Sequence, residues 1–285
     1  MKSMTAFLAL MLLSASLSDA AERNAPVAFH FINYPGSTRT SLLGVSNRNV
    51  AVGSYYDQGG VQHGFMVTSS GVFTTIDNPN GVGTTVLYSV NSNGAIVGRY
   101  GVSQHFQAFS YDHGVFHDIA PPNAGASAAY GINDLGQIAG DFLDTDGILK
   151  GWVFDGANYQ TLLVPGSRTT SAQYINVHGI VTLQWVDSSF VANSSIYDGT
   201  TYTTVNVPGA AGSRAHALDS AADVIYEWFD SARNTHSALF SSQTFTKFDL
   251  PGCANTVATG INDHRVILGT CFSSPTQYRG FYITY

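Results

Sequence analysis

The sequence predicts an all-β fold, a six-bladed β-propeller of four-stranded blades whose ring is closed by an N-terminal strand. Three observations predict it: one repeat fills the chain after a short leader, each copy carries four strand signals, and the first and last copies are incomplete in complementary ways. The composition agrees, because aromatic residues make up 12%, charged residues only 11%, and 29 residues are glycine. Many glycines and aromatics are typical of short strands joined by tight turns.

One proline sets the register of the repeat. It recurs at intervals of 43 or 44 residues, within the range of about 20 to 50 residues that is typical of propellers and solenoids. Units that begin seven residues before each proline fill residues 28–285, so we expect a single repeat domain. The six prolines are Pro35, Pro79, Pro122, Pro165, Pro208 and Pro251.

The turn signals indicate where each blade begins. Three of the connections that follow one another along the chain are short, as at Asp155-Gly156, a pair that tight hairpins favour because Gly adopts positive φ at no steric cost. The connection that contains the proline is longer, and we expect it to be the crossover between blades. Each blade then takes its outermost strand from the following unit.

The last blade lacks one strand under this division. Its three strands fall at about residues 256–262, 265–272 and 279–284, and the segment from Ala28 to Asn33 supplies the fourth. A ring closed in this way removes two exposed sheet edges that would otherwise promote aggregation. An open solenoid is the alternative, but it requires atypical polar units at both ends, whereas this chain begins and ends with complementary incomplete units.

The first twenty residues have the features of a secretory signal peptide. Lys2 precedes an apolar run over residues 6–13, and Ser18 and Ala20 place small residues at the −3 and −1 positions of a cleavage site. The apolar run is too short to span a bilayer. We therefore expect a signal peptide over residues 1–20, a short tether over residues 21–27, and a secreted or periplasmic mature protein with no membrane span.

The charge pattern argues against nucleic acid as a partner. The net charge is −7, and the three lysines, Lys2, Lys150 and Lys247, form no basic patch. The nine histidines show no HExxH motif and no paired metal-ligand spacing, so we expect no metal and no cofactor. We expect the protein to be a monomer.

The repeat resembles a known group of sequences. The segment GINDLGQIAG (Gly131–Gly140), an HGF strand, and FTTID followed by a proline are similar to the bacterial extracellular repeats of the HAF family. The resemblance covers all six units, strongly in the first three and the last and more weakly in residues 158–243, where Leu183 and Tyr226 replace a glycine of the other copies. It implies an exported or cell-surface repeat protein, and it brings no catalytic residues with it.

Polar side chains recur at two positions of the unit. A hydrogen-bonding side chain stands 28 residues after every proline, and an aspartate stands 22 residues after four of them. They predict either a ligand-binding rim or an internal bridge that closes the loop between the third and fourth strands, and we favour the bridge because a hairpin brings the two groups within bonding reach. The first set is His63, Gln107, Lys150, Asn193, His236 and Arg279, and the aspartates are Asp57, Asp144, Asp187 and Asp230.

Aromatic side chains recur about 20 residues after the proline and also have two interpretations. They could stack against sugars, since a ring offers a flat apolar face, or pack between neighbouring blades, which is the commoner use. Trp185 and Trp228 stand in the two most divergent copies, so we keep them as ligand-binding candidates. The remaining members are Tyr55, Tyr100 and Phe142.

We expect ligands on the face formed by the proline crossovers and by the loops between the third and fourth strands. Besides the two tryptophans, the ligand-binding candidates are Arg39, Arg168, Arg214 and His216.

Catalytic groups are scarce in the sequence. Beyond the leader, Glu22 and Glu227 are the only glutamates, and no GxSxG motif marks a serine nucleophile. A glycosidase needs two carboxylates, for which Glu227 and Asp230 are the only inviting pair. We predict an exported, non-enzymatic binding or scaffolding module that recognises an extracellular glycan or protein; the alternative is a hydrolase or lyase that acts on polysaccharide.

The two cysteines, Cys253 and Cys271, both lie in the last unit. An even number of cysteines in an exported protein predicts a disulfide. A hairpin turn at residues 262–265 places Cys271 opposite about residue 256 and therefore near Cys253. The bridge would fasten the blade that closes the ring.

Overall fold

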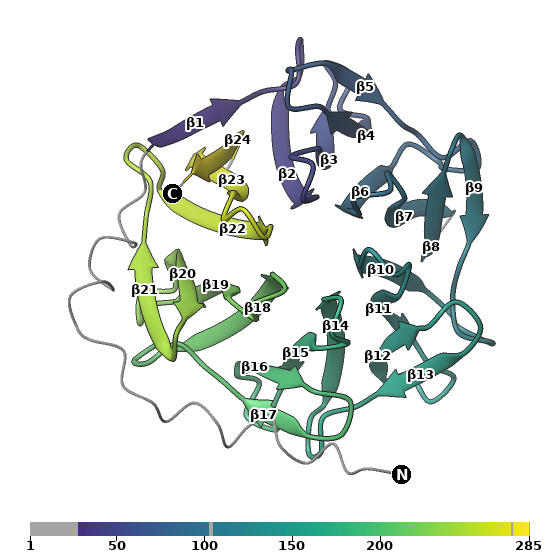
Figure 1. The fold of residues 1–285 in the computed structure, drawn as a ribbon, viewed down its shortest axis with the longest axis vertical. Helices are drawn as coiled ribbons and strands as arrows, with labels where there is room; N and C mark the ends of the chain where they lie inside the picture. The colour runs from purple at the N-terminus through teal and green to yellow at the C-terminus, as the bar shows by residue number, and fades with distance from the viewer. Residues whose placement is uncertain (1–27, 103–104, 275, 285) are drawn as a thin grey trace.

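The computed structural model describes residues 28–102, 105–274 and 276–284, and every regular element in these ranges is a β-strand. The strands form six antiparallel four-stranded sheets, arranged like blades around a central axis (Figure 1). The predicted six-bladed β-propeller is confirmed. The expected signal peptide and tether, residues 1–27, lie outside the described residues.

Each blade runs from an inner strand at the axis to an outer strand at the rim, and we number the blades by their inner strands. The inner strands are β2 (Arg39–Val45), β6 (Thr85–Val90), β10 (Ser127–Ile132), β14 (Thr169–Ile175), β18 (Gly212–Leu218) and β22 (Asn255–Ile261). The second strands are β3 (Ala51–Tyr56), β7 (Ile96–Val102), β11 (Ile138–Leu143), β15 (Val181–Val186), β19 (Val224–Phe229) and β23 (Ile267–Ser274). The third strands are β4 (Gln62–Val67), β8 (His105–Asp112), β12 (Leu149–Phe154), β16 (Ala192–Tyr197), β20 (Thr235–Ser241) and β24 (Gln277–Thr284). The outer strands are β5 (Phe73–Thr75), β9 (Val115–Asp118), β13 (Tyr159–Leu162), β17 (Tyr202–Thr204), β21 (Thr244–Phe248) and, for blade 6, β1 (Ala28–Ile32).

The ring closes in blade 6, where the two ends of the chain meet. β1 pairs antiparallel with β24 in a continuous register from Ala28 opposite Thr284 to Ile32 opposite Gly280. In Figure 1 the purple N-terminal strand accordingly lies beside the yellow C-terminal strands. This is the closure predicted from the proline register, and it covers the edge of β24 that would otherwise accept a strand from another chain.

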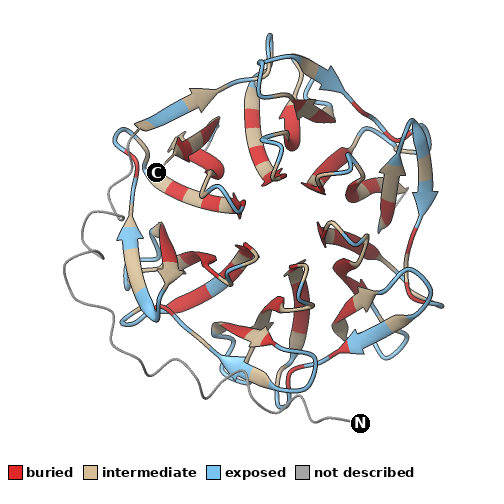
Figure 2. Cartoon of the chain, in the orientation of Figure 1, coloured by how far each residue is buried: buried red, intermediate tan, exposed pale blue. Residues whose placement is uncertain are grey.

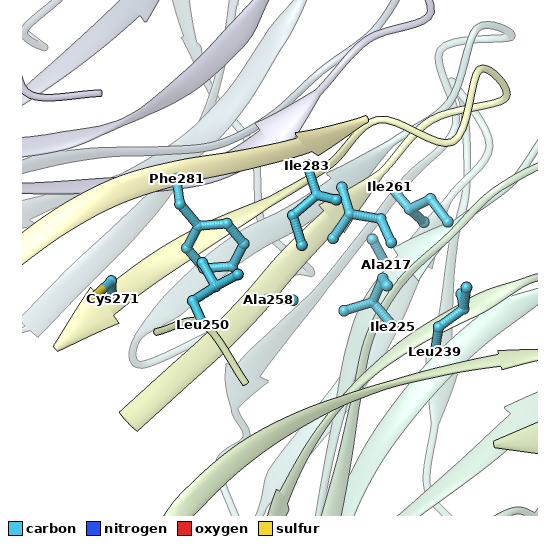
Figure 3. Packing of buried hydrophobic residues seen from close by; sticks show 10 residues of the cluster. Ala217, Ile225, Leu239, Leu250, Ala258, Ile261, Cys271, Phe281 and Ile283 are labelled. Carbon is cyan, nitrogen blue, oxygen red and sulfur yellow. The ribbon is translucent and has the colours of Figure 1, made fainter. Parts of the chain in front are cut away.

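The hydrophobic core lies between successive blades. Buried residues concentrate on the inner strands, whereas the outer strands are largely exposed (Figure 2). The cluster between blades 5 and 6 shows the arrangement, because strands of both blades contribute to it (Figure 3). Its members include Ala217, Ile225 and Leu239 from blade 5 and Ala258, Ile261, Phe281 and Ile283 from blade 6.

The divergent repeats of blades 4 and 5 keep this core filled by exchanging a large and a small residue. In blade 3 the second strand has Gly140 opposite Trp152, and a Cβ on that glycine would lie 2.6 Å from the indole. In blade 5 the pair is reversed, with Tyr226 opposite Ala238 and both fully buried. Blade 4 pairs Leu183 with a small Ser195 in the same way. Because interiors are close-packed, the two changes in each blade compensate one another.

A β-bulge interrupts every inner strand at the same place. The bulge gives the inner strand one extra residue; in blade 5, His216 and Ala217 are both unpaired and lie opposite Ile225. Bulges re-aim side chains and recur next to functional sites. The unpaired residues of the inner strands are Leu43, Tyr88, Tyr130, Gln173, His216 with Ala217, and Thr259.

The predicted disulfide is present in blade 6. Cys253 and Cys271 are bonded, with their Cα atoms 5.4 Å apart. Cys271 lies opposite Thr256 in the register of β22 and β23, as the turn at residues 262–265 predicted. The bridge ties the crossover that enters the blade to the second strand of that blade.

Candidate functional site

The candidate site lies at one end of the central channel. The inner strands begin on the face formed by the proline crossovers and by the loops between the second and third strands of each blade, which we call the crossover face. The second and third strands of a blade are the third and fourth of each repeat unit when the unit is counted from its FTTID-like strand. On this face Arg214 of β18 stands directly opposite Glu227 of β19. Arg214 Nη1 donates to Glu227 Oε2 at 3.4 Å, and His216 Nε2 lies 3.4 Å from the same oxygen. We call Arg214, His216, Glu227 and the nearby Phe229 the blade-5 cluster.

Glu227 stays ionised in spite of its burial. Its side chain is 11% exposed, whereas that of Arg214 is 44% exposed. Burial alone would raise the pKa of Glu227, but the charges and hydrogen bonds of His216 and Arg214 outweigh it and lower the pKa below its ordinary value. The cluster therefore offers a fixed anionic acceptor beside a guanidinium whose remaining N–H groups can reach a ligand.

An aromatic ring lies under each of the three predicted arginines. The guanidinium of Arg214 is 5.0 Å from the ring centre of Phe229, and that of Arg168 is 4.2 Å from Phe190. Arg39 lies over Tyr56 at 5.3 Å and over Tyr278 of blade 6 at 5.1 Å. Stacking of this kind holds a guanidinium in a fixed plane.

Phe190 stands out among these rings because of its backbone. It is 72% exposed and has a φ of +64°, a region that bulky residues rarely adopt. In blades 1 and 3 the same loop position is held by the glycines Gly60 and Gly147, also at positive φ. A phenylalanine at this position therefore presents a ring to solvent at the tip of the loop.

The two candidate tryptophans are engaged within their own blades. The Trp228 ring stacks on His236 at 4.4 Å and lies 4.0 Å from the Lys247 ammonium, and its Nε1 donates to Ser237 O. Trp185 packs against the core of blade 4, and its Nε1 donates to the Ser195 hydroxyl. The structure does not bring either indole into the blade-5 cluster. The other repeated aromatics, Tyr55, Tyr100 and Phe142, are buried, as expected for packing residues.

The predicted bridges across the loops of the crossover face are present in four blades. The contacts are His63 Nε2 to Asp57 at 3.5 Å, Lys150 Nζ to Asp144 at 2.7 Å, Asn193 Nδ2 to Asp187 at 3.4 Å, and His236 Nε2 to Asp230 at 3.5 Å. These polar groups satisfy one another, so their recurrence follows from loop closure.

Three of the bridges include a second carboxylate. Lys150 Nζ lies 2.6 Å from Asp146 in the same loop, and the two histidine bridges reach a carboxylate outside their loop that the sequence analysis missed. His63 Nδ1 lies 2.6 Å from Asp77, and His236 Nδ1 lies 2.7 Å from Asp249. Burial opposes protonation of His63, but the hydrogen bonds and charges of Asp77 and Asp57 raise its pKa. The signal was available, because both aspartates end the FTTID-like strand that pairs with the histidine's strand.

The two candidate catalytic carboxylates occupy separate networks. Glu227 contacts Arg214 and His216, whereas Asp230 accepts from Asn234 and lies near His236. The Asn234 hydrogen bonds lower the pKa of Asp230, and that of Glu227 is lowered as well. Glycoside hydrolysis by acid–base catalysis requires one carboxylic acid with a raised pKa. This pair supplies two anions and no such acid.

Neither a metal site nor a membrane helix is found in the described part of the chain. No group of three or more His, Cys, Asp or Glu side chains there is placed to hold a metal ion. In the same residues, no helix has the length and apolar character that crossing a membrane requires.

Comparison with solved structures returns other propellers. Among them are a mutant of AofleA from Arthrobotrys oligospora (TM-score 0.59, 13% identity, 90% of this chain and 87% of that chain) and a mutant of the Aleuria aurantia lectin in complex with α-methyl-L-fucoside (0.54, 12%, 90% and 93%). A catalytically inactive virginiamycin B lyase from Staphylococcus aureus with quinupristin is also similar (0.53, 13%, 90% and 99%). No family model and no curated sequence matches the chain. At these identities the similarity establishes the fold alone.

Proposed function

We propose that the protein is an exported, non-enzymatic binding module that recognises an extracellular glycan at the blade-5 cluster. The observation that carries the proposal is the convergence of a half-exposed guanidinium, an ionised carboxylate and an aromatic ring at the channel end. Sugars present hydroxyl groups that donate and accept, together with flat C–H faces. Arg214 supplies donors, Glu227 supplies an acceptor and Phe229 supplies an apolar face.

Other features support binding and not catalysis. Glu227 and Asp230, the candidate pair, both have pKa values below their ordinary values, so neither is the protonated acid that glycoside hydrolysis needs. Solved lectin structures of the same six-bladed fold carry a fucoside, which makes a glycan a reasonable ligand class to test. The expected leader and the disulfide agree with an exported protein, as does the resemblance of the repeat to the HAF group.

A glycan array tests the proposal. We expect the wild-type protein to bind a defined subset of oligosaccharides and Arg214→Ala to lose that binding, since the variant removes the exposed donor. Trp228→Ala serves as the comparison, because its ring is engaged by His236 and Lys247, and it should bind the same subset. A folded wild-type protein that binds no glycan, or an Arg214→Ala variant that binds like the wild type, would overturn the proposal.

A further inference from the structure

A cavity lies on the axis of the ring, next to the blade-5 cluster. Residues of all six inner strands line it, and these strands surround the axis in Figure 1. Its volume is about 110 Å³. This is of the same order as the roughly 150 Å³ of an engineered cavity that takes up benzene, so the space suits a ligand with a single ring.

The β-bulges of the inner strands build the wall of this cavity. The residue that each bulge leaves unpaired lines the cavity in every blade. A bulge at one shared position turns the same repeat residue toward the axis six times, although its chemical type differs from blade to blade. The six residues are Leu43, Tyr88, Tyr130, Gln173, His216 and Thr259.

Tyr174 closes the cavity on the side away from the crossover face. Tyr174 directly follows Gln173 on its inner strand. In the other blades the residue at this position has a small side chain or none, as at Gly44, Gly131 and Ala217. In blade 4 it is a tyrosine that hydrogen-bonds to Ser89 of blade 2 and packs against the cores of blades 5 and 6. Tyr174 also lines a second, smaller cavity at the opposite end of the channel. Tyr174 therefore separates the two cavities.

The chemistry of the lining fits a neutral ligand that carries hydroxyl groups. Tyr88, Tyr130, Gln173, His216 and Thr259 line the cavity with polar side chains, and no carboxylate, lysine or arginine is part of the lining. Gln173 Nε2 and Thr259 Oγ1 already donate within the protein, to Ser171 and to the Leu42 carbonyl, so these two side chains offer a ligand their acceptor oxygens. The Tyr130 hydroxyl is hydrogen-bonded to Asp141. The tyrosine rings and aliphatic side chains provide apolar surface beside these groups. Such a combination recognises a sugar ring, whose edge is polar and whose face is apolar.

We infer that this cavity receives the terminal sugar residue of the glycan, while the blade-5 cluster holds the adjoining residue. The inference rests on the proposed function. His216 connects the two sites, because it lines the cavity and lies 3.4 Å from Glu227. Since Tyr174 closes the far side, a chain cannot pass through the axis. Only the end of a glycan can enter the cavity, so the protein recognises glycan termini and not internal segments.

The test compares Leu43→Trp, which fills the cavity, with Leu135→Trp as a matched control. Leu135 is 69% exposed on the turn between β10 and β11, at the opposite end of the channel from the crossover face. Binding is measured on oligosaccharides that bind the wild type and on the same oligosaccharides with one more sugar attached to the terminal residue. Far-ultraviolet circular dichroism and thermal unfolding establish that both variants are folded.

We expect extension of the terminal residue, or Leu43→Trp, to weaken binding at least tenfold, with Leu135→Trp unchanged. A folded Leu43→Trp variant that binds like the wild type would overturn the inference, and so would equal affinity for extended glycans. Both results leave the proposed function intact as long as Arg214→Ala still abolishes binding. A wild-type protein that binds no glycan removes the proposed function and this inference together.

Discussion

The side-chain amide of Asn133 donates a 2.9 Å hydrogen bond to the backbone carbonyl of Asn176, the residue at the same position of the next blade. The side-chain oxygen of Asn133 meanwhile accepts from the backbone amides of Leu135 and Gln137, at 3.0 and 2.9 Å. One side chain therefore closes its own turn and ties its blade to the next. The same cross-blade bond runs from Asn91 to Asn133, from Asn176 to Asp219 and from Asn262 to Ser46.

Replacing Asn133 with alanine should destabilise the ring as a whole. The change removes the caps of two turn amides and the partner of the buried Asn176 carbonyl, and we expect a loss of about 2 to 3 kcal/mol in the free energy of unfolding. Urea denaturation measures it. Asn158→Ala is the matched control, because Asn158 is exposed and its side chain bonds only within its own hairpin. A loss for Asn133→Ala no larger than that of the control would contradict the inter-blade role.

Asp219 occupies the asparagine position in blade 5 and should make stability depend on pH. Burial raises its pKa to about 6, because an ionised carboxylate there is poorly solvated. The folded state then binds more protons than the unfolded state, so this residue's contribution to stability falls as pH rises from about 4 to about 6 and is constant above that.

Asp219→Asn should therefore stabilise the protein by roughly 1 kcal/mol at pH 7, and the gain should disappear near pH 4. The difference in unfolding free energy between variant and wild type, measured from pH 4 to pH 7, gives the result. Asp141, whose pKa burial also raises to about 6, titrates in both proteins and cancels from that difference. A difference that does not change with pH would refute the assignment.

The disulfide should contribute substantially to the stability of the closing blade. It closes a loop over a sequence separation of 18 residues, for which the chain-entropy model gives about 3 kcal/mol. We expect Cys253→Ser combined with Cys271→Ser to lose stability of this order in urea. The unfolded wild-type chain should take up no alkylating reagent until a reductant is added, and labelling of two thiols without reductant would show that the bridge does not form.

Ring closure predicts that the first described strand is indispensable. A chain of residues 34–285 lacks β1 and leaves the edge of β24 unpaired, so we expect it to aggregate or to unfold without a cooperative transition. A chain of residues 28–285 keeps the strand and is the control. Size-exclusion chromatography and thermal unfolding compare the two. A soluble, cooperatively folded 34–285 chain would argue against the sealing role of β1.

The sequence contained most of the fold because the repeat is local and regular. The proline interval predicted the strand order and the closure of the ring by residues 28–33, and the turn at residues 262–265 predicted the Cys253–Cys271 bridge. The same regularity explained the bridges between aspartate and donor, since both partners lie in one hairpin. The repeat pattern could not predict contacts between side chains of different blades, nor how the volumes of facing core side chains compensate one another.

Tyr174 illustrates the limit of the sequence pattern. Nothing in its own unit indicates that it reaches Ser89 of blade 2, because that contact arises only when the ring is closed. The paired exchange of Gly140 and Trp152 for Tyr226 and Ala238 was visible only as a weakening of the repeat. The register of β19 and β20 shows that it is a repacking of the core.

The most direct test of glycan binding at the blade-5 cluster is a titration of Glu227→Gln and Asp230→Asn with an oligosaccharide that binds the wild type. Both substitutions remove one carboxylate from the same blade and the same face. We expect that Glu227→Gln weakens binding at least tenfold, that Asp230→Asn binds like the wild type, and that the oligosaccharide is recovered intact from all three proteins. Cleavage of the oligosaccharide by the wild type, abolished equally by both substitutions, would contradict it and establish the pair as catalytic.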